Sequence, residues 1–139
     1  GAIFGITRAT GPNELAKAAL EAVCFQTMDL LSAMHSDCPS NIKNDGVLRV
    51  DGGMAANDWC MQFLADILDI PIERPERIET TAFGAAYISG MYKGFYPEKD
   101  NFLRSWKCQK RFEPKMSQTL RKRKSNLWQE AIKRISYSV

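Results

Sequence analysis

Residues 47–57 constrain the fold more than any other part of this chain, because they read as an apolar strand, two adjacent glycines and the start of a helix. A glycine pair at such a junction lets the backbone approach a bound group without a Cβ in the way. The following helix directs its free N–H groups and the positive end of its dipole toward the same place. The spacing is neither Gly-x-Gly-x-x-Gly nor the phosphate loop ending in Gly-Lys-Ser/Thr. On the residues alone, both a tight turn and a nucleotide site remain open, and the turn is the more frequent of the two.

Hydrophobic periodicity predicts that strands and helices alternate along the chain. The predicted elements are a strand at residues 1–6, a long core helix at 12–35, a buried strand at 47–50, a helix at 57–69, an extended piece at 70–75 and a helix at 80–90. Prolines confine the extended piece to a sheet edge or a sheet end. The small residues of the last helix lower its helix propensity, which indicates that another element packs closely against it. The alternation predicts an α/β fold with too few strands for a self-sufficient sheet.

Charge divides the chain into two parts. Residues 1–103 carry 8 Lys and Arg against 14 Asp and Glu, whereas residues 104–139 carry 11 against 2. The basic part invites a nucleic-acid interpretation, centred on residues 121–124. An amphipathic helix that docks its solvated cations near the acidic remainder is the alternative, with an apolar face of Leu120, Leu127, Trp128, Ala131, Ile132 and Ile135. No groove pattern of aromatic and basic residues accompanies the run, so we expect no nucleic-acid partner.

The cysteines indicate neither a metal site nor a disulfide framework. The four of them, at positions 24, 38, 60 and 108, are far apart, and His35 is the one histidine. Zinc sites need clustered thiolate or imidazole ligands, which this spacing does not provide. Scattered thiols predict a reducing compartment. No window of the sequence predicts a membrane span or an export signal.

Three spaced motifs together resemble the FGGY family of carbohydrate kinases. Residues 1–6, with 14–15 and 18–21, resemble the second signature of the family. Residues 49–58, with 61–63, resemble its adenosine-contacting Gly-Gly loop, although Met54 is bulkier than the residue of many relatives. Residues 72–76, with 79–82 and 84–87, resemble the segment that closes the domain in the members that act on glycerol. The likeness is close over residues 1–95 and loose through 111–114 and 128–134.

The resemblance implies an actin-like ATPase fold, in which two ribonuclease-H-like domains enclose a cleft, and this chain would be an α/β part of the C-terminal domain. Residues 1–103 would lie on the nucleotide side, and residues 104–139 would form a basic tail whose helix packs on the same domain. Gly53 and Asn57 would contact ATP, and Gly52 would be needed for the turn. The catalytic carboxylate, the polyol-binding residues and the first phosphate loop would all precede this segment, so we assign it no catalytic and no metal-binding residue.

The reaction implied by the resemblance is transfer of the ATP γ-phosphoryl group, with Mg²⁺, to glycerol, which gives sn-glycerol 3-phosphate. The expected partners are ATP or ADP, glycerol, the N-terminal half of the same protein and further copies in a homo-oligomer. The expected location is cytoplasmic, with association with the mitochondrial outer surface left open. Two alternatives also stay open: another FGGY sugar or polyol kinase, and a catalytically silent paralogue that acts as a binding protein.

Overall fold

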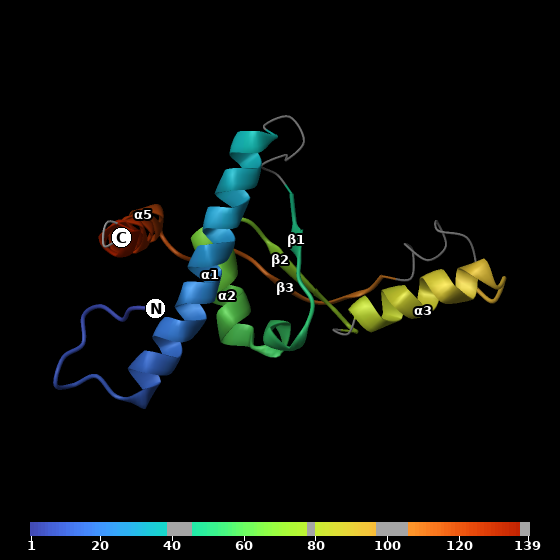
Figure 1. The fold of residues 1–139 in the computed structure, drawn as a ribbon, viewed down its shortest axis with the longest axis horizontal. Coiled ribbons are helices and arrows are strands. Elements are labelled where there is room, and N and C mark those ends of the chain that lie inside the picture. Colours follow the sequence, from blue (N-terminus) through green and yellow to red (C-terminus); the bar gives the residue numbers. More distant parts are fainter. Residues whose placement is uncertain (39–45, 78–79, 97–105, 137–139) are drawn as a thin grey trace.

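The computed structural model describes residues 1–38, 46–77, 80–96 and 106–136, and it shows a mixed helix and sheet fold (Figure 1). In chain order the elements are α1 (Pro12–Asp37), β1 (Leu48–Arg49), the short 3-10 helix η1 (Gly53–Ala56), α2 (Asp58–Leu68), β2 (Ile72–Pro75), α3 (Thr80–Tyr92), β3 (Cys108–Phe112) and α5 (Gln118–Ser136). The three predicted helices before residue 95 and the α/β alternation are confirmed. No helix in these described ranges is long and apolar enough to cross a membrane.

Local signals in the sequence explain where α1 and α2 begin. Pro12 occupies the first position of α1, where its fixed φ suits a helix and its missing N–H costs nothing. The Glu14 carboxylate accepts a hydrogen bond from the Gly11 N–H at 2.8 Å, and this bond lowers the pKa of Glu14. Asn57 caps α2, and Asp69 ends it with a left-handed φ of 59°. Both helices therefore start where a side chain satisfies a free N–H group.

The sheet has three strands in the order β1-β2-β3. β1 pairs with β2 in parallel, with Leu48 opposite Ile72, and β3 pairs with β2 antiparallel, with Phe112 opposite Ile72. The strand expected to be buried, β1, is thus at the edge of the described sheet. β2, whose prolines were expected to confine it to a sheet edge or a sheet end, is the central strand and has its prolines at its two ends. The prolines allow this because Pro71 precedes β2 and only its carbonyl is used, while Pro75 is the last residue of β2, beside an irregularity in the ladder.

Sequence reasoning did not predict β3. Its first four residues are exposed and Phe112 alone is buried. An exposed strand without alternating apolar residues gives no periodic signal, so its pairing with β2 is visible only in the tertiary structure.

The core lies between α1, α2 and β2. α1 packs on α2, and α2 in turn packs on β2 and β3. Ile72 and Ala65 are completely buried at 0% exposure, and Phe63 of α2 meets the Phe25 ring of α1 edge-on, with ring centroids 5.7 Å apart. One aromatic of the tail joins this core, because Trp128 stacks on Phe25 at 5.2 Å. The helix predicted at 57–69 does direct its apolar residues inward.

The strand predicted at residues 1–6 is wrong. This segment has no secondary structure and curves away from the helices (Figure 1), and Ile3 and Ile6 are 62% and 63% exposed. A strand needs a neighbour for its N–H and C=O groups. None of the three strands in the described residues pairs with this segment, so its apolar alternation has no sheet to join.

α3 extends away from α1 and α2 (Figure 1), and its small residues have different surroundings. A Cβ added at Gly84 would meet nothing within 4 Å, so no described element packs there. At Gly90 the place of a Cβ is taken by the ring of Tyr96, which the chain brings back beside the helix. The expected close approach therefore occurs at Gly90 and is made by the chain's own next turn.

α5 docks by part of the face predicted for it. Trp128, Ala131 and Ile132 are half-buried, as expected, whereas Leu120, Leu127 and Ile135, also expected inside, are 42%, 55% and 43% exposed. The inner face also carries Arg121, which pairs with Asp69 at 2.7 Å, and Lys124, which pairs with Glu21 at 3.0 Å. These two cations lie inside because carboxylates of the facing elements accept their hydrogen bonds. The expected boundary between residues 103 and 104 lies outside the described residues, as do most of the predicted loop at 37–46 and Glu79 of the third motif; the domain division stays a prediction.

Candidate functional site

The glycine pair forms a turn whose geometry suits glycine at its first position. Gly52 has φ 83° and ψ 172°, a combination that residues with a Cβ rarely adopt. Its carbonyl accepts a hydrogen bond from the Ala55 N–H at 3.0 Å, and η1 begins at the next residue. A Cβ at Gly52 would meet no atom within 4 Å, so the restriction at this position is one of backbone conformation and not of space.

Gly53 differs from Gly52 in its backbone conformation but not in the space around it. Its φ lies outside the left-handed region, and a Cβ built on it would also meet nothing within 4 Å. The position is exposed, as is the following Met54, whereas Ala55 is buried. Nothing in the described part of the chain requires glycine at position 53, so the open space above it is available to a molecule that approaches the backbone.

The two polar atoms of the Asn57 amide have different roles. Its Oδ1 accepts a hydrogen bond from the Cys60 N–H at 3.1 Å and so caps α2. The acceptor atom is therefore occupied, while no acceptor for the amide nitrogen occurs among the residues described here. Because Asn57 is exposed at the N-terminus of α2, its amide nitrogen offers two N–H donors at the surface, four residues after the exposed Gly53.

A buried arginine is hydrogen-bonded to the Gly-Gly loop. Arg74 of β2 is 7% exposed, and its NH1 donates to the Ala55 carbonyl at 2.7 Å and to Asp58 Oδ1 at 2.9 Å. Its Nε donates to Gln109 Oε1 at 2.7 Å. Lys110 Nζ reaches the other Asp58 oxygen at 2.6 Å, and hydrogen bonds from Lys110 and then Arg74 lower the pKa of Asp58.

Sequence reasoning gave no role to Arg74, Gln109 or Lys110, although one signal was present. In a strand, residues two apart share a face, so Arg74 lies on the face of the buried Ile72. A charged residue at an inward strand position needs partners, and a search for them would have pointed to this network.

Asp58 and Asp66, at the two ends of α2, both have partners within the protein. Asp58 is held by two cations, and Asp66 Oδ1 accepts hydrogen bonds from the N–H groups of Lys115 and Met116 at 2.6 and 3.1 Å. In the described ranges, no group of three or more His, Cys, Asp or Glu side chains could hold a metal ion.

Two thiols that looked scattered in the sequence meet in the core. The Sγ atoms of Cys24 in α1 and Cys60 in α2 are 3.6 Å apart, and each residue is 1% exposed. Burial raises the pKa of Cys24, and the neighbouring Cys60 raises it further. Both thiols are packed in the core, and all four cysteines are free. Their spacing in the sequence gave no sign that Cys24 and Cys60 are neighbours.

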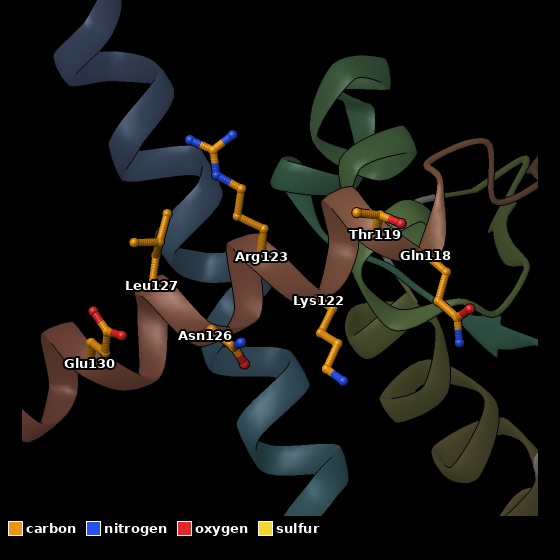
Figure 2. Close-up of a pocket in the computed structure, with 7 residues that line it drawn as sticks. All are labelled: Gln118, Thr119, Lys122, Arg123, Asn126, Leu127 and Glu130. Carbon is orange, nitrogen blue, oxygen red and sulfur yellow. The ribbon is translucent and has the colours of Figure 1, made fainter.

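A hollow of about 590 Å³ runs along α5, and its lining includes no residue of the Gly-Gly loop (Figure 2). It is lined by Gln118, Thr119, Lys122, Arg123, Asn126, Leu127 and Glu130. In Figure 2, Lys122 and Arg123 extend to opposite sides of the helix, so the polar groups do not converge on one point. Another hollow, of about 480 Å³, lies beside the loop and includes Asp58, Trp59 and Lys110.

Comparison with known proteins matches residues 1–92 to the FGGY family of carbohydrate kinases, C-terminal domain. Among curated relatives, glycerol kinase of Sinorhizobium fredii is 57% identical over 134 residues, which cover 96% of this chain and 27% of the relative. Glycerol kinase of Bradyrhizobium diazoefficiens is 56% identical over 133 residues, again 96% and 27%. The chain thus spans about a quarter of the length of these relatives.

Solved structures agree with the sequence comparison. The glycerol kinase of Plasmodium falciparum, solved with ADP, superposes with a TM-score of 0.77 at 32% identity, over 96% of this chain and 26% of that one. A ligand-bound xylulose kinase from Lactobacillus acidophilus also has a TM-score of 0.77, at 20% identity, over 99% of this chain and 27% of that one. At that identity, the second likeness supports the fold alone.

Proposed function

Because the chain belongs to the FGGY family of carbohydrate kinases, we propose that it is the nucleotide-side, C-terminal portion of a glycerol kinase. Its α/β fold is that of the C-terminal domain of these kinases, within the actin-like ATPase arrangement. The activity is that of the whole enzyme: transfer of the γ-phosphoryl group of ATP to glycerol, which gives sn-glycerol 3-phosphate. Curated relatives at 52–57% identity that are named glycerol kinase support glycerol as the acceptor.

One observation carries the nucleotide assignment: the exposed side of the loop combines open space at Gly53 with unused amide donors on Asn57. Backbone N–H groups and a side-chain amide suit the oxygens and ring nitrogens of a nucleotide. The N-terminus of α2 adds the positive end of a helix dipole. The ADP of the Plasmodium falciparum relative gives the class of ligand, which we extend to this chain.

In this proposal the chain binds and orients the nucleotide, and the bond-breaking groups come from the rest of the protein. Gly52 sets the turn, Gly53 lets the nucleotide lie against the backbone, and Asn57 fixes it by hydrogen bonds. Mg²⁺ bound with ATP would neutralise phosphate charge. No group of metal-ligating side chains in the described residues fits a Mg²⁺ site, and both Asp58 oxygens are engaged by cations, so no step here runs through the metal.

The remaining parts of the proposal concern the whole protein. We propose that the N-terminal half supplies the acceptor pocket, that the kinase is a cytoplasmic homo-oligomer, and that association with the mitochondrial outer surface is the alternative location. A panel of glycerol, other polyols and sugars, assayed with the full-length protein, separates a glycerol kinase from another FGGY kinase. Failure to phosphorylate any of them indicates a catalytically silent paralogue.

Two substitutions at Asn57 separate its two tasks. Asn57→Asp keeps an oxygen to cap α2 but removes the amide donors, whereas Asn57→Ala removes both. In the full-length kinase we expect both variants to raise the KM for ATP by about tenfold or more, the worth of a lost ligand hydrogen bond at a desolvated site. Only Asn57→Ala should also speed hydrogen exchange in α2, by about fivefold.

The matched control removes a cap from a helix far from the loop. Ser117 precedes α5, and its Oγ accepts from the Leu120 N–H at 3.4 Å. Ser117→Ala should loosen the start of α5 and leave the KM for ATP unchanged. An Asn57→Asp enzyme with wild-type KM for ATP would contradict the proposed nucleotide contact.

A further inference from the structure

We propose that Arg74 is a positioning residue for the nucleotide loop: from β2, it fixes the Ala55 carbonyl and the first turn of α2, and so sets where Gly53 and Asn57 meet the nucleotide. The nucleotide part of this inference rests on the proposed function. The control of loop geometry by Arg74 does not, because it follows from contacts within the chain.

The burial of Arg74 requires that its charge be satisfied by the protein. Its side chain is 9% exposed, although guanidinium groups are seldom buried without partners. Three acceptors meet this need: the Ala55 carbonyl and Asp58 Oδ1 at NH1, and Gln109 Oε1 at Nε. Two of the three belong to the loop and the helix it starts, and the third belongs to β3. Arg74 therefore ties the sheet to the loop.

The position of these contacts along the chain explains why they control the site. Ala55 is two residues after Gly53, and Asp58 directly follows Asn57. One guanidinium nitrogen thus bridges η1, which begins at Gly53, and the first residue of α2, on either side of Asn57. Without this bridge, the end of η1 and the start of α2 can move relative to each other, which moves the Asn57 amide relative to the Gly53 backbone.

The chemistry of the network favours arginine over lysine. A guanidinium holds Nε and NH1 at fixed, diverging angles, so it can bond Gln109 and the loop at once. An ammonium at the end of a flexible chain is a single point of contact and can satisfy only part of this set. Lys110 is a different case, since it is half exposed and bonds Asp58 Oδ2 alone.

The test compares two arginines in the full-length kinase. Arg74→Met removes the donors while keeping an apolar stem of similar length. Arg121→Met is the control, because Arg121 also donates to backbone carbonyls, of Asp66 and Met116, and pairs with Asp69, beyond the C-terminal half of α2 and away from the loop. Both variants lose a comparable set of contacts, but only one loses contacts to the loop.

For Arg74→Met we expect the KM for ATP to rise about tenfold with kcat at saturating ATP within about threefold, since the loop can still be ordered by bound nucleotide. Hydrogen exchange of residues 52–57 without nucleotide should become about tenfold faster. Arg74→Lys should fall between wild type and Arg74→Met in both measurements. Arg121→Met should leave the KM for ATP and the exchange of residues 52–57 as in wild type.

The outcomes separate this inference from the proposed function. Wild-type KM and wild-type loop exchange in Arg74→Met would overturn it, and so would an equal rise of KM in Arg121→Met, which would indicate general destabilisation. If Asn57→Asp loses ATP affinity and Arg74→Met keeps it, the positioning role alone fails. If the wild-type kinase binds no ATP, the proposed function fails, and loop exchange still decides whether Arg74 orders the loop. If Arg74→Met does not fold, Arg74→Lys decides by the same two measurements.

Discussion

Trp128 anchors α5 to the body of the protein through two separable contacts. Its ring stacks on Phe25 of α1, with centroids 5.2 Å apart and planes at 11°. Its Nε1 donates to Asp29 Oδ2 at 2.6 Å, while Gln129 donates to the other oxygen of the same carboxylate at 2.7 Å. Trp128→Phe keeps the stack and removes the hydrogen bond, and Trp128→Ala removes both.

The two substitutions should reduce the local stability of α5 by different amounts. In Trp128→Phe the Asp29 carboxylate keeps its bond from Gln129 and some access to water, so the loss should be about 1 kcal/mol, the net value of an ordinary hydrogen bond. Trp128→Ala also removes the stacked ring and leaves a cavity beside Phe25. The expected loss is then about 3 kcal/mol, the low end for a large aromatic because Trp128 is only half-buried.

Hydrogen exchange of α5 (Gln118–Ser136), followed by mass spectrometry, measures these losses locally. A loss of about 1 kcal/mol corresponds to about fivefold faster exchange, and about 3 kcal/mol to about 150-fold. Trp59 provides the matched control, because it also stacks on a phenylalanine, Phe63 at 5.5 Å, but does not belong to α5. Equal exchange of α5 in Trp128→Phe and Trp128→Ala would refute the separation of the contacts, and faster exchange of α5 in Trp59→Phe would refute its local nature.

Two further predictions concern the loop and the thiols. Gly52→Ala should destabilise the protein by about 1–3 kcal/mol because of the positive φ at this position, whereas Gly53→Ala should leave the melting temperature unchanged and weaken ATP binding. Thermal melts with and without ATP test this pair. Equal melting temperatures of the two variants without ATP would contradict the prediction. In the native protein, a thiol reagent should modify the exposed Cys38 and Cys108 rapidly and spare the buried Cys24 and Cys60. Because burial raises the pKa of Cys24, raising the pH from 7 to 9 should not make this thiol reactive. Comparable labelling of all four thiols at pH 9 would refute the prediction.

The sequence predicted best those elements whose signals are local. The apolar stripe and Pro12 predicted α1, and the pattern after Asn57 predicted α2 with its buried face. Both helices follow from spacing and capping, which act within a few residues. The strand predicted at residues 1–6 and the buried position predicted for β1 were wrong, and the inner face predicted for α5 was right only in part. All three depend on what lies next to a segment in space. Adjacent residues carry no information about such a neighbour.

The candidate site shows the same division. Gly52, Gly53 and Asn57 were predicted from a contiguous motif, and the structure places the three within one short loop. Arg74 and Gln109 were missed because they come from two other strands. Arg74 reaches Asp58 across 16 residues of sequence, and Gln109 in turn accepts from Arg74 across 35 residues. Motifs in the sequence join residues that are close along the chain, whereas a hydrogen-bond network joins residues that are close in the folded structure.

The sequence by itself therefore determined the helices before residue 95, the family and the loop where a nucleotide is proposed to bind, because periodicity, caps and glycine turns are set by residues near one another. Only the tertiary structure decided the arrangement around that loop. It brought the Arg74 guanidinium under Ala55, placed the Cys24 and Cys60 thiols together and turned cations of α5 inward. Each of these depends on distance in space, where a buried charge or thiol must find its partners among residues far away in the chain.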